Sequence, residues 1–216
     1  MKKSMWSTLS KMTLAGSVLM ASCAPLMEEP TQIKQVTDSE ALAAPESSTN
    51  PNARKAVEKN YFERFTNQLA QVDENGNPTL SIPSFFPGTG SGNSSHMGNA
   101  FTFLNQYASV GANGLGTVGA PVTQFYSAEL EDLGLVVDNP DVSSVTTDGK
   151  GNSVWFKNTQ NTITTSSEER IDFEAEVEIV GGTGKFENAS GAATVIGYFN
   201  PTNGQGMSTI QGRIEY

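Results

Sequence analysis

Apolar and polar residues alternate most regularly between Ile171 and Phe199. In the first part of this stretch the apolar residues Ile171, Phe173, Ala175, Val177 and Ile179 alternate with the acidic residues Asp172, Glu174, Glu176 and Glu178. A period of two places the apolar set on one face of a β-strand and the acids on the other. A second strand is predicted from Ala192 to Phe199, after a glycine-rich turn. This pattern predicts a sheet with one buried face and one anionic, solvated face.

Shorter segments with β-compatible composition occur along most of the chain after residue 60. Strands are predicted over residues 79–82, 100–108, 122–128, 142–147, 153–157 and 207–216, and residues 61–72 fit either a first strand or a short helix. Residues 83–98 read as a long loop or edge segment, residues 110–121 as a flexible connection, and residues 129–138 as a helical turn followed by a short apolar run. Short strands with Gly-rich turns indicate an all-β sandwich or barrel, and the last segment is suited to closing a barrel.

The N-terminal region has the features of a targeting segment. Lys2, Lys3 and Lys11 precede or flank the short apolar run 12–20, and small residues stand before Cys23, the only cysteine. This pattern resembles a bacterial lipoprotein signal, in which the cysteine is acylated; an ordinary signal peptide with an incidental cysteine is the alternative. The predicted organisation is a signal peptide over 1–22, a Pro-containing disordered tether over 23–58, and a β domain over 59–216.

Charge restricts the partners. With the three lysines of residues 1–22 removed, 10 basic and 23 acidic residues leave a formal charge of −13. Such a chain repels nucleic acid and offers no basic patch for phosphates. The expected partner is a membrane, reached through the lipid anchor on Cys23. The expected location is the bacterial cell envelope, anchored to the outer membrane and facing either the periplasm or the outside.

The turn between the two organising strands carries a family resemblance. Residues 181–191, GGTGKFENASG, are similar to the GGTGRFxxATG signature of bacterial secreted β-barrel proteins related in fold to allene oxide cyclase and dirigent proteins. Residues 95–98 are similar to that group's Thr-His-Leu-Gly element, and residues 148–156 to its NGDxLxF hairpin. Lys185 replaces the usual Arg, and Ser190 the usual Thr.

The resemblance covers residues 61–216 and concerns the fold more than the chemistry. It implies an antiparallel, calycin-like (allene oxide cyclase-like) barrel of about eight strands. Such a barrel either holds one small ligand or is filled by its own side chains. Carrying over a cyclase activity would rest on fold analogy alone.

Few residues suggest chemistry. His96, the sole histidine, is a weak catalytic candidate, because no nucleophile motif accompanies it. Asp172, Glu174 and Glu176 are weak calcium candidates, since metal cages usually draw ligands from loops. Gly181, Gly182, Gly184 and Gly191 fit a structural turn and lack the pattern of a phosphate-binding loop. Gly182 and Gly184 are expected to adopt backbone angles that other residues avoid, and Phe186 is expected to pack inward. The aromatic residues Phe101, Phe103, Tyr126, Trp155 and Tyr198 line either a ligand-binding mouth or the core.

The resulting hypothesis is a cell-envelope lipoprotein with a non-enzymatic β-barrel that binds a small hydrophobic ligand. No cofactor is expected. One alternative is an allene-oxide-cyclase-like isomerase or cyclase, which requires polar side chains in a closed cavity. Another is a surface structural or adhesion protein, which requires an exposed apolar patch.

Overall fold

The computed structural model describes residues 56–112 and 114–216. In chain order the elements are β1 (Glu58–Leu69), β2 (Ser84–Phe85), β3 (Gly88–Ser94), β4 (Gly98–Leu104), β5 (Gln106–Gly111), β6 (Gly114–Gly119), α1 (Thr123–Asp132), β7 (Ser144–Thr147), β8 (Ser153–Ser167), β9 (Arg170–Thr183), a 3₁₀-helix (Gly184–Phe186), β10 (Ser190–Phe199) and β11 (Gln205–Glu215). Strands dominate, as the alternating sequence pattern predicts.

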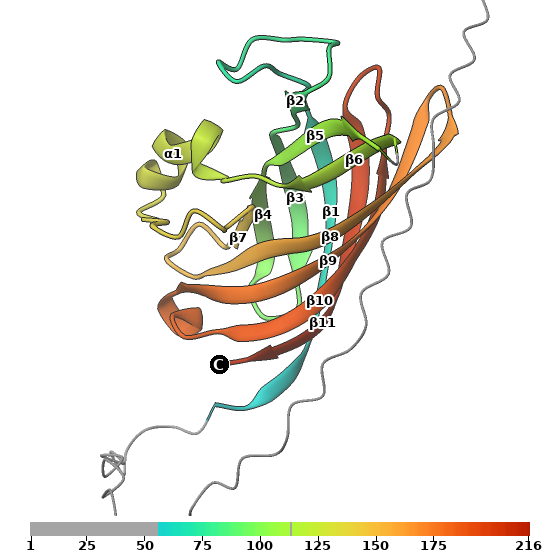
Figure 1. The fold of residues 1–216 in the computed structure, drawn as a ribbon. Coiled ribbons are helices and arrows are strands. Elements are labelled where there is room, and N and C mark those ends of the chain that lie inside the picture. The colour runs from blue at the N-terminus through green and yellow to red at the C-terminus, as the bar shows by residue number, and fades with distance from the viewer. Residues whose placement is uncertain (1–55, 113) are drawn as a thin grey trace, which may run out of the picture. The chain divides into compact units, whose positions relative to one another are not determined.

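Eight strands form a closed barrel in the order β1-β11-β10-β9-β8-β7-β4-β3 (Figure 1). All neighbouring pairs are antiparallel. β1 closes the barrel, because it pairs with β11 on one side and with β3 on the other. The predicted all-β antiparallel barrel of about eight strands is therefore confirmed, and so is the closing role of the C-terminal strand.

β1 shows how the alternation directs side chains. Tyr61, Glu63, Phe65 and Asn67 are buried, whereas Phe62, Arg64, Thr66 and Gln68 between them are exposed. The same alternation holds in β9, where Ala175, Val177 and Ile179 are buried and the intervening glutamates are exposed. The segment that fitted either a strand or a helix is thus a strand, with one inward face.

Apolar side chains fill the end of the barrel at which β1 begins and β11 ends. This cluster consists of Tyr61, Val154, Phe156, Val177, Ile179, Phe186, Ala189, Ala193, Ile210 and Ile214. At about 25 cal/mol per Å² of apolar surface removed from water, such a cluster supplies much of a domain's stability.

The glycine motif forms the turn between β9 and β10. Gly184 has a φ of +61°, which disfavours any side chain, as predicted. For Gly182 the predicted unusual backbone angle is wrong, and the need for glycine is close approach: a Cβ there would lie 2.0 Å from the carbonyl oxygen of Ser153. Phe186 follows and is fully buried, as expected.

Three predictions between residues 100 and 128 are wrong. The predicted strand 100–108 is broken at the buried Asn105, whose side chain donates a hydrogen bond to the carbonyl of Pro121. The predicted connection 110–121 contains the end of β5 and all of β6, which pair as a hairpin. The predicted strand 122–128 is the beginning of α1, because Val122 and Leu130 pack against Leu135, Val142 and Val145 and this packing overrides the β-rich composition.

Two further segments differ from the prediction. Residues 79–82 form no strand, and residues 83–98, for which a loop or an edge segment was expected, contain β2 and β3. The inward positions of β3 are the glycines 88, 90 and 92, followed by Ser94. Glycine at these positions removes the apolar alternation by which a strand is recognised in a sequence.

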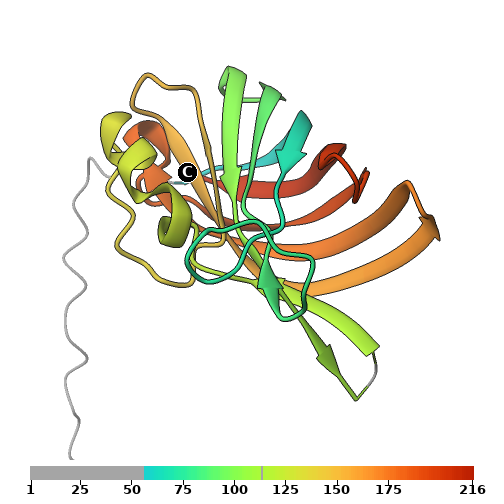
Figure 2. The same cartoon turned by 90° about the horizontal axis from the view of Figure 1, so that it is seen from above.

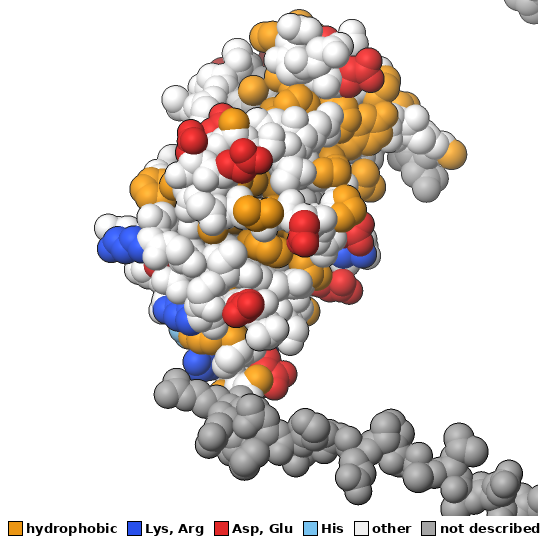
Figure 3. Space-filling view, turned by 90° about the vertical axis from the view of Figure 1, so that its left-hand side faces the viewer, with side chains coloured by type: hydrophobic (Ala, Val, Ile, Leu, Met, Phe, Trp, Pro, Cys, Tyr) orange, Lys and Arg blue, Asp and Glu red, His pale blue; other side chains and the backbone are white. Residues whose placement is uncertain are grey.

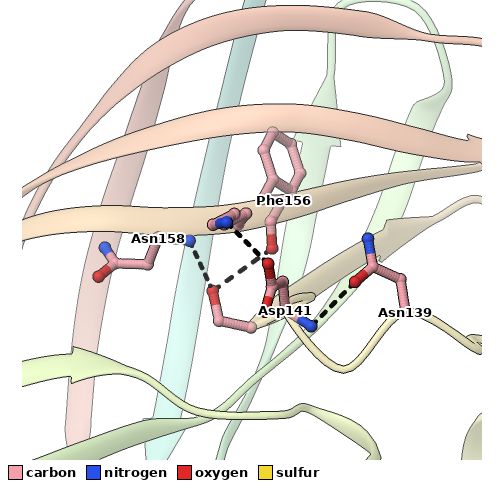
Figure 4. A network of polar contacts seen from close by, with 6 residues as sticks. Asn139, Asp141, Phe156 and Asn158 are labelled. Atoms are coloured by element: carbon pink, nitrogen blue, oxygen red, sulfur yellow. Dashed lines mark hydrogen bonds and ion pairs between the residues drawn. The ribbon is translucent and has the colours of Figure 1, made fainter.

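Side chains fix the segment between α1 and β7 to the barrel (Figure 4). The Asn139 side chain accepts a hydrogen bond from the backbone of Asp141, and Asp141 forms a salt bridge of 2.7 Å with Lys157 on β8. Ser143 Oγ accepts the backbone N–H of Asn158. α1 is thereby held outside the barrel. On the side of the molecule that carries α1, acidic side chains are scattered between apolar ones (Figure 3).

β2, β5 and β6 form a separate three-stranded sheet beside the barrel (Figure 2). β7 is short and pairs with β8 only from Ser153 to Phe156. Beyond Phe156, β8 runs next to β6, and among the described residues no backbone ladder joins these two strands. We call this boundary the β6–β8 seam.

Candidate functional site

A cavity of about 150 Å³ occupies the barrel end away from the apolar cluster. Its apolar walls come mainly from β1, β9, β10 and β11, together with Phe86 and the β5–β6 hairpin. The apolar lining consists of Phe65, Leu69, Phe86, Leu104, Ala108, Leu115, Ile163, Ile171, Phe173, Ala175, Val177, Val195, Phe199 and Ile210. Phe86 packs on Phe199 with ring centroids 6.2 Å apart.

The polar part of the lining is uncharged. It consists of Asn67, Thr102, Gln106, Thr117, Ser143, Ser144, Asn158, Asn161 and Ser208. None of the described residues that line the cavity is Lys, Arg, Asp, Glu or His. The site is therefore an apolar pocket with a limited number of neutral hydrogen-bonding groups, which is the usual composition of small-molecule sites.

Amide side chains bridge the β6–β8 seam at the cavity wall. Asn161 Nδ2 on β8 donates to Gln106 Oε1 at 2.7 Å and to Thr117 Oγ1 at 2.9 Å. Asn158 Nδ2 donates to Asn161 Oδ1, and Asn158 Oδ1 accepts the backbone N–H of Gly119. The wall of the cavity at the seam is thus held by side chains, with no strand pairing there among the described residues.

A further amide of the lining, Asn67 on β1, is only 4% exposed. Its Nδ2 donates to Ser208 Oγ at 2.8 Å across the β1–β11 ladder. Its Oδ1 is buried and has no hydrogen-bond partner among the described residues. Among the described residues that line the cavity, Asn67 alone has a buried side-chain polar atom without a hydrogen-bond partner.

A carboxylic acid lies one layer below the cavity. Glu63 is 0% exposed, and it accepts hydrogen bonds from Tyr61 Oη at 2.5 Å and Thr146 Oγ1 at 3.0 Å. Ile210 stands directly opposite Glu63 in the β1–β11 ladder, and Ile210 lines the cavity. Glu63 itself is not among the residues that line the cavity, whereas Phe65, two residues further along the same face of β1, is.

Burial changes the acidity of this pair. Removal from water raises the pKa of Glu63 to about 7, although the hydrogen bonds from Tyr61 and Thr146 oppose that rise. Burial, followed by the nearby charge of Glu63, raises the pKa of Tyr61 well above its usual value. No Lys or Arg of the described residues forms a salt bridge with Glu63.

The aromatic candidates lie outside the cavity. Phe103 packs on Tyr126 of α1, and Trp155 packs in the same cluster while its Nε1 donates to Ser153 Oγ. Tyr198 lies under the Arg170 guanidinium at 3.9 Å, and Phe101 is 50% exposed. Phe101, Phe103 and Tyr198 line an open depression that extends over β1, β3 and β4.

The remaining candidates are in structural positions. His96 Nε2 donates a hydrogen bond to the carbonyl oxygen of Asn60 at 2.7 Å. Lys185 Nζ donates a hydrogen bond to the backbone carbonyl of His96. Ser95 Oγ accepts the backbone N–H of Phe62 and does not meet the imidazole. The structure brings no nucleophile to His96 among the described residues.

The acidic candidates are dispersed. Asp172 pairs with Arg170 at 2.7 Å, and Glu174 and Glu176 are exposed along β9. The described residues include no group of three or more His, Cys, Asp or Glu that could hold a metal ion. Within 56–112 and 114–216, no helix is long and apolar enough to span a membrane. Cys23, the signal segment and the tether lie outside the described residues.

Sequence reasoning missed Glu63, Asn67 and the seam amides. A signal for the first two was present, because Glu63 and Asn67 share the period-two face of Tyr61 and Phe65. The amides 158 and 161 lie beyond the predicted strand 153–157, so no sequence pattern assigned them to a cavity.

The fold and the site together define the protein as an eight-stranded antiparallel barrel with an uncharged internal pocket. No protein-family model matches the chain, and no curated protein matches it. Among solved structures, a pterocarpan synthase dirigent protein is similar at 15% sequence identity, covering 76% of this chain and 87% of that one, with a TM-score of 0.45. Dirigent proteins are one of the two groups named above from the glycine motif; at this score the likeness carries no argument for function.

Proposed function

We propose that this chain is an envelope lipoprotein whose barrel binds a small apolar ligand in the cavity. The observation that carries the proposal is that one end of the barrel is filled by apolar side chains while the other encloses about 150 Å³ with mostly apolar walls. A cavity of about this size holds a benzene-sized group. The ligand therefore inserts a ring or a short chain.

A cavity-filling variant tests the binding proposal. Ala175 lines the cavity, so Ala175→Phe should occupy the space, whereas Thr194→Phe on the outward side of β10 should leave it open. Native mass spectrometry of the full chain purified gently from its host should show an extra mass that leaves on denaturation. The mass should persist in Thr194→Phe and disappear in Ala175→Phe. A bare wild-type mass, or an adduct unchanged by Ala175→Phe, would contradict the proposal.

The anchor is tested separately. Cys23 follows a lipoprotein-like signal, and acyl chains contribute about 0.8 kcal/mol per buried CH₂. The wild-type chain should partition into the detergent phase of Triton X-114, and Cys23→Ser should move to the aqueous phase. Equal partitioning of both chains would refute the acylation of Cys23 without affecting the cavity.

Catalysis is less well supported than binding. An isomerase or cyclase needs a polar group that reaches the ligand, but Glu63 does not line the cavity and both of its carboxylate oxygens already accept hydrogen bonds. The cavity therefore supports a container better than an acid–base enzyme.

A further inference from the structure

We propose that an open depression on the outer face of the barrel binds a neutral oligosaccharide chain. We call this surface the outer depression. It lies over β1, β3, β4, β10 and β11, and residues from the β8–β9 and β10–β11 turns also line it. Its volume is about 1180 Å³, far larger than the 150 Å³ of the internal cavity. The proposal goes beyond ligand binding in the internal cavity and does not depend on it.

A row of outward side chains crosses five strands on the floor of the outer depression. Phe101 on β4 stands opposite Ser91 on β3, and Ser91 stands opposite Thr66 on β1. The row continues from Thr66 to Met207 on β11 and then to Tyr198 on β10, and all five residues line the depression. Four strand spacings of about 4.8 Å separate Phe101 from Tyr198, so the row is about as long as a chain of four hexose units. The floor therefore suits an elongated ligand that lies across the strands.

A second row lies beside the first and extends its polar surface. Phe103, Thr89, Gln68 and Gln205 follow one another across β4, β3, β1 and β11, and all four line the outer depression. The hydroxyl and amide groups of the two rows occupy exposed positions of β1, β3 and β11, so their donors and acceptors are open to a ligand. Sugar hydroxyls both donate and accept hydrogen bonds, and neutral amide and hydroxyl side chains meet both requirements.

The two ends of the first row carry aromatic rings. Phe101 is 50% exposed beside polar neighbours. One face of a hexose ring presents C–H groups, which pack on the face of an aromatic side chain. At the other end the Arg170 guanidinium lies 3.9 Å from the centre of the Tyr198 ring, and this stacked pair offers polar hydrogens to a ligand. Phe101 is thus the expected stacking platform, and the Arg170–Tyr198 pair is the polar end.

Charge and the distribution of apolar groups favour a neutral saccharide over other occupants. Arg170 is the only Lys or Arg among the described residues that line the outer depression; it is already paired with Asp172, and Glu169 also lines the surface. A chain of formal charge −10 that offers one paired cation does not favour a polyanion. A protein partner is usually anchored by large side chains at the centre of its interface, whereas Thr66 occupies the centre of this row.

Saccharides of defined charge and length test the proposal. Affinities are measured by isothermal titration calorimetry with the full-length protein, in a detergent without a sugar headgroup. The probes are the monosaccharides and neutral tetrasaccharides of four kinds, and one anionic tetrasaccharide: cellotetraose, maltotetraose, mannotetraose, chitotetraose and tetragalacturonate. At least one neutral tetrasaccharide should bind about 10-fold or more tightly than both its monosaccharide and tetragalacturonate. Failure of all four neutral tetrasaccharides to bind at about 10 mM would overturn the proposal, and tighter binding of tetragalacturonate would overturn the neutral class.

Variants locate the saccharide on the first row. Phe101→Ala should weaken binding of the best tetrasaccharide about 10-fold or more, and Thr66→Val and Ser91→Ala about 5-fold each. The matched control Phe62→Ala removes a similarly exposed phenylalanine from the outward face of β1, outside the outer depression, and should leave the affinity unchanged. If Phe101→Ala binds the tetrasaccharide as tightly as Phe62→Ala does, the saccharide lies elsewhere and the proposal is refuted.

The saccharide site and the internal cavity can fail separately. Ala175→Phe fills the cavity and should leave saccharide affinity unchanged, whereas Phe101→Ala should leave the native adduct in place. Loss of saccharide binding in Ala175→Phe would place the saccharide in the cavity and contradict the outer site. A native adduct without saccharide binding would leave the proposed function standing and refute this inference.

Discussion

Glu63 is an acid on the inward face of a strand, and its surroundings fix how the barrel responds to pH. Its pKa rises from 4.5 to about 7 on burial, so the folded protein binds a proton more tightly than the unfolded chain does. The stability that this proton contributes is complete below about pH 4.5 and is lost as the pH rises through 7. One pKa unit corresponds to about 1.4 kcal/mol, so the loss is about 3 kcal/mol.

Replacing this acid by its neutral isostere should remove that pH dependence. Glu63→Gln keeps an oxygen that accepts from Tyr61 or Thr146 but cannot ionise. The free energy of unfolding in urea should therefore fall by about 3 kcal/mol between pH 4.5 and 8 in the wild type and change much less in Glu63→Gln. Glu176→Gln, on the exposed face of β9, should follow the wild type. Parallel pH profiles for wild type and Glu63→Gln would show that Glu63 is not the titrating group.

Substitution of Gly182 tests how closely the glycine turn packs against the backbone of Ser153. A Cβ at this position would lie 2.0 Å from Ser153 O and 2.9 Å from Phe186 Cβ, so Gly182→Ala should destabilise the fold by about 2–3 kcal/mol. Gly116→Ala meets no atom within 4 Å and should change stability by less than about 1 kcal/mol. Urea midpoints measure both. Equal midpoints would mean that the turn relaxes freely around the new methyl group.

At the scale of single residues, the sequence shows which positions of β1 point inward, but it does not show which partners the polar groups at those positions have. The alternation through Tyr61, Glu63, Phe65 and Asn67 is visible in the sequence, and it puts two polar groups among aromatic ones. Which partners satisfy them depends on strands far along the chain: Thr146 for Glu63, and Ser208 for Asn67. Local patterns carry no information on such contacts.

At the scale of elements, the β6–β8 seam is the part of the wall held by the fewest backbone bonds. Asn161→Leu removes the two hydrogen bonds to Gln106 and Thr117, each of which contributes about 1 kcal/mol. Amides of the β5–β6 hairpin should then exchange hydrogen for deuterium about 10-fold faster or more, while those of β1 and β11 keep their protection.

The control for this measurement is on the same strand. Thr162→Val changes an exposed residue of β8 and should leave hairpin exchange as in the wild type. If the hairpin in Asn161→Leu exchanges at the wild-type rate, apolar contacts and not the amides hold the seam.

Element prediction from the sequence succeeded where alternation is strong and failed where packing decides. β9, β10 and β11 have clear two-residue periods, and all three were placed correctly. The sequence does not identify β3 as a strand because three of its inward positions are glycines. It predicts a strand for the first part of α1, where several residues are β-branched or aromatic, and a helical turn for the residues from 129 on, four of which belong to α1. The sequence predicts that the last strand is suited to closing a barrel, but its pairing with β1 is known only from the structure.

At the scale of the whole molecule, the barrel should be an autonomous folding unit. Residues Asn50–Tyr216 form one compact unit by their contacts, and β1 and β11 close it internally. A fragment of residues 50–216 should therefore have the same urea midpoint as the longer chain, and its free energy of unfolding should agree within about 0.5 kcal/mol. A clearly lower midpoint for the fragment would show that residues before 50 contribute to the fold.

β1 enters the barrel at the filled end and runs toward the cavity, from Glu58 to Leu69. This direction has a consequence for labelling. A fluorophore attached at the start of β1 would lie at the filled end of the barrel and would leave the cavity end unobstructed.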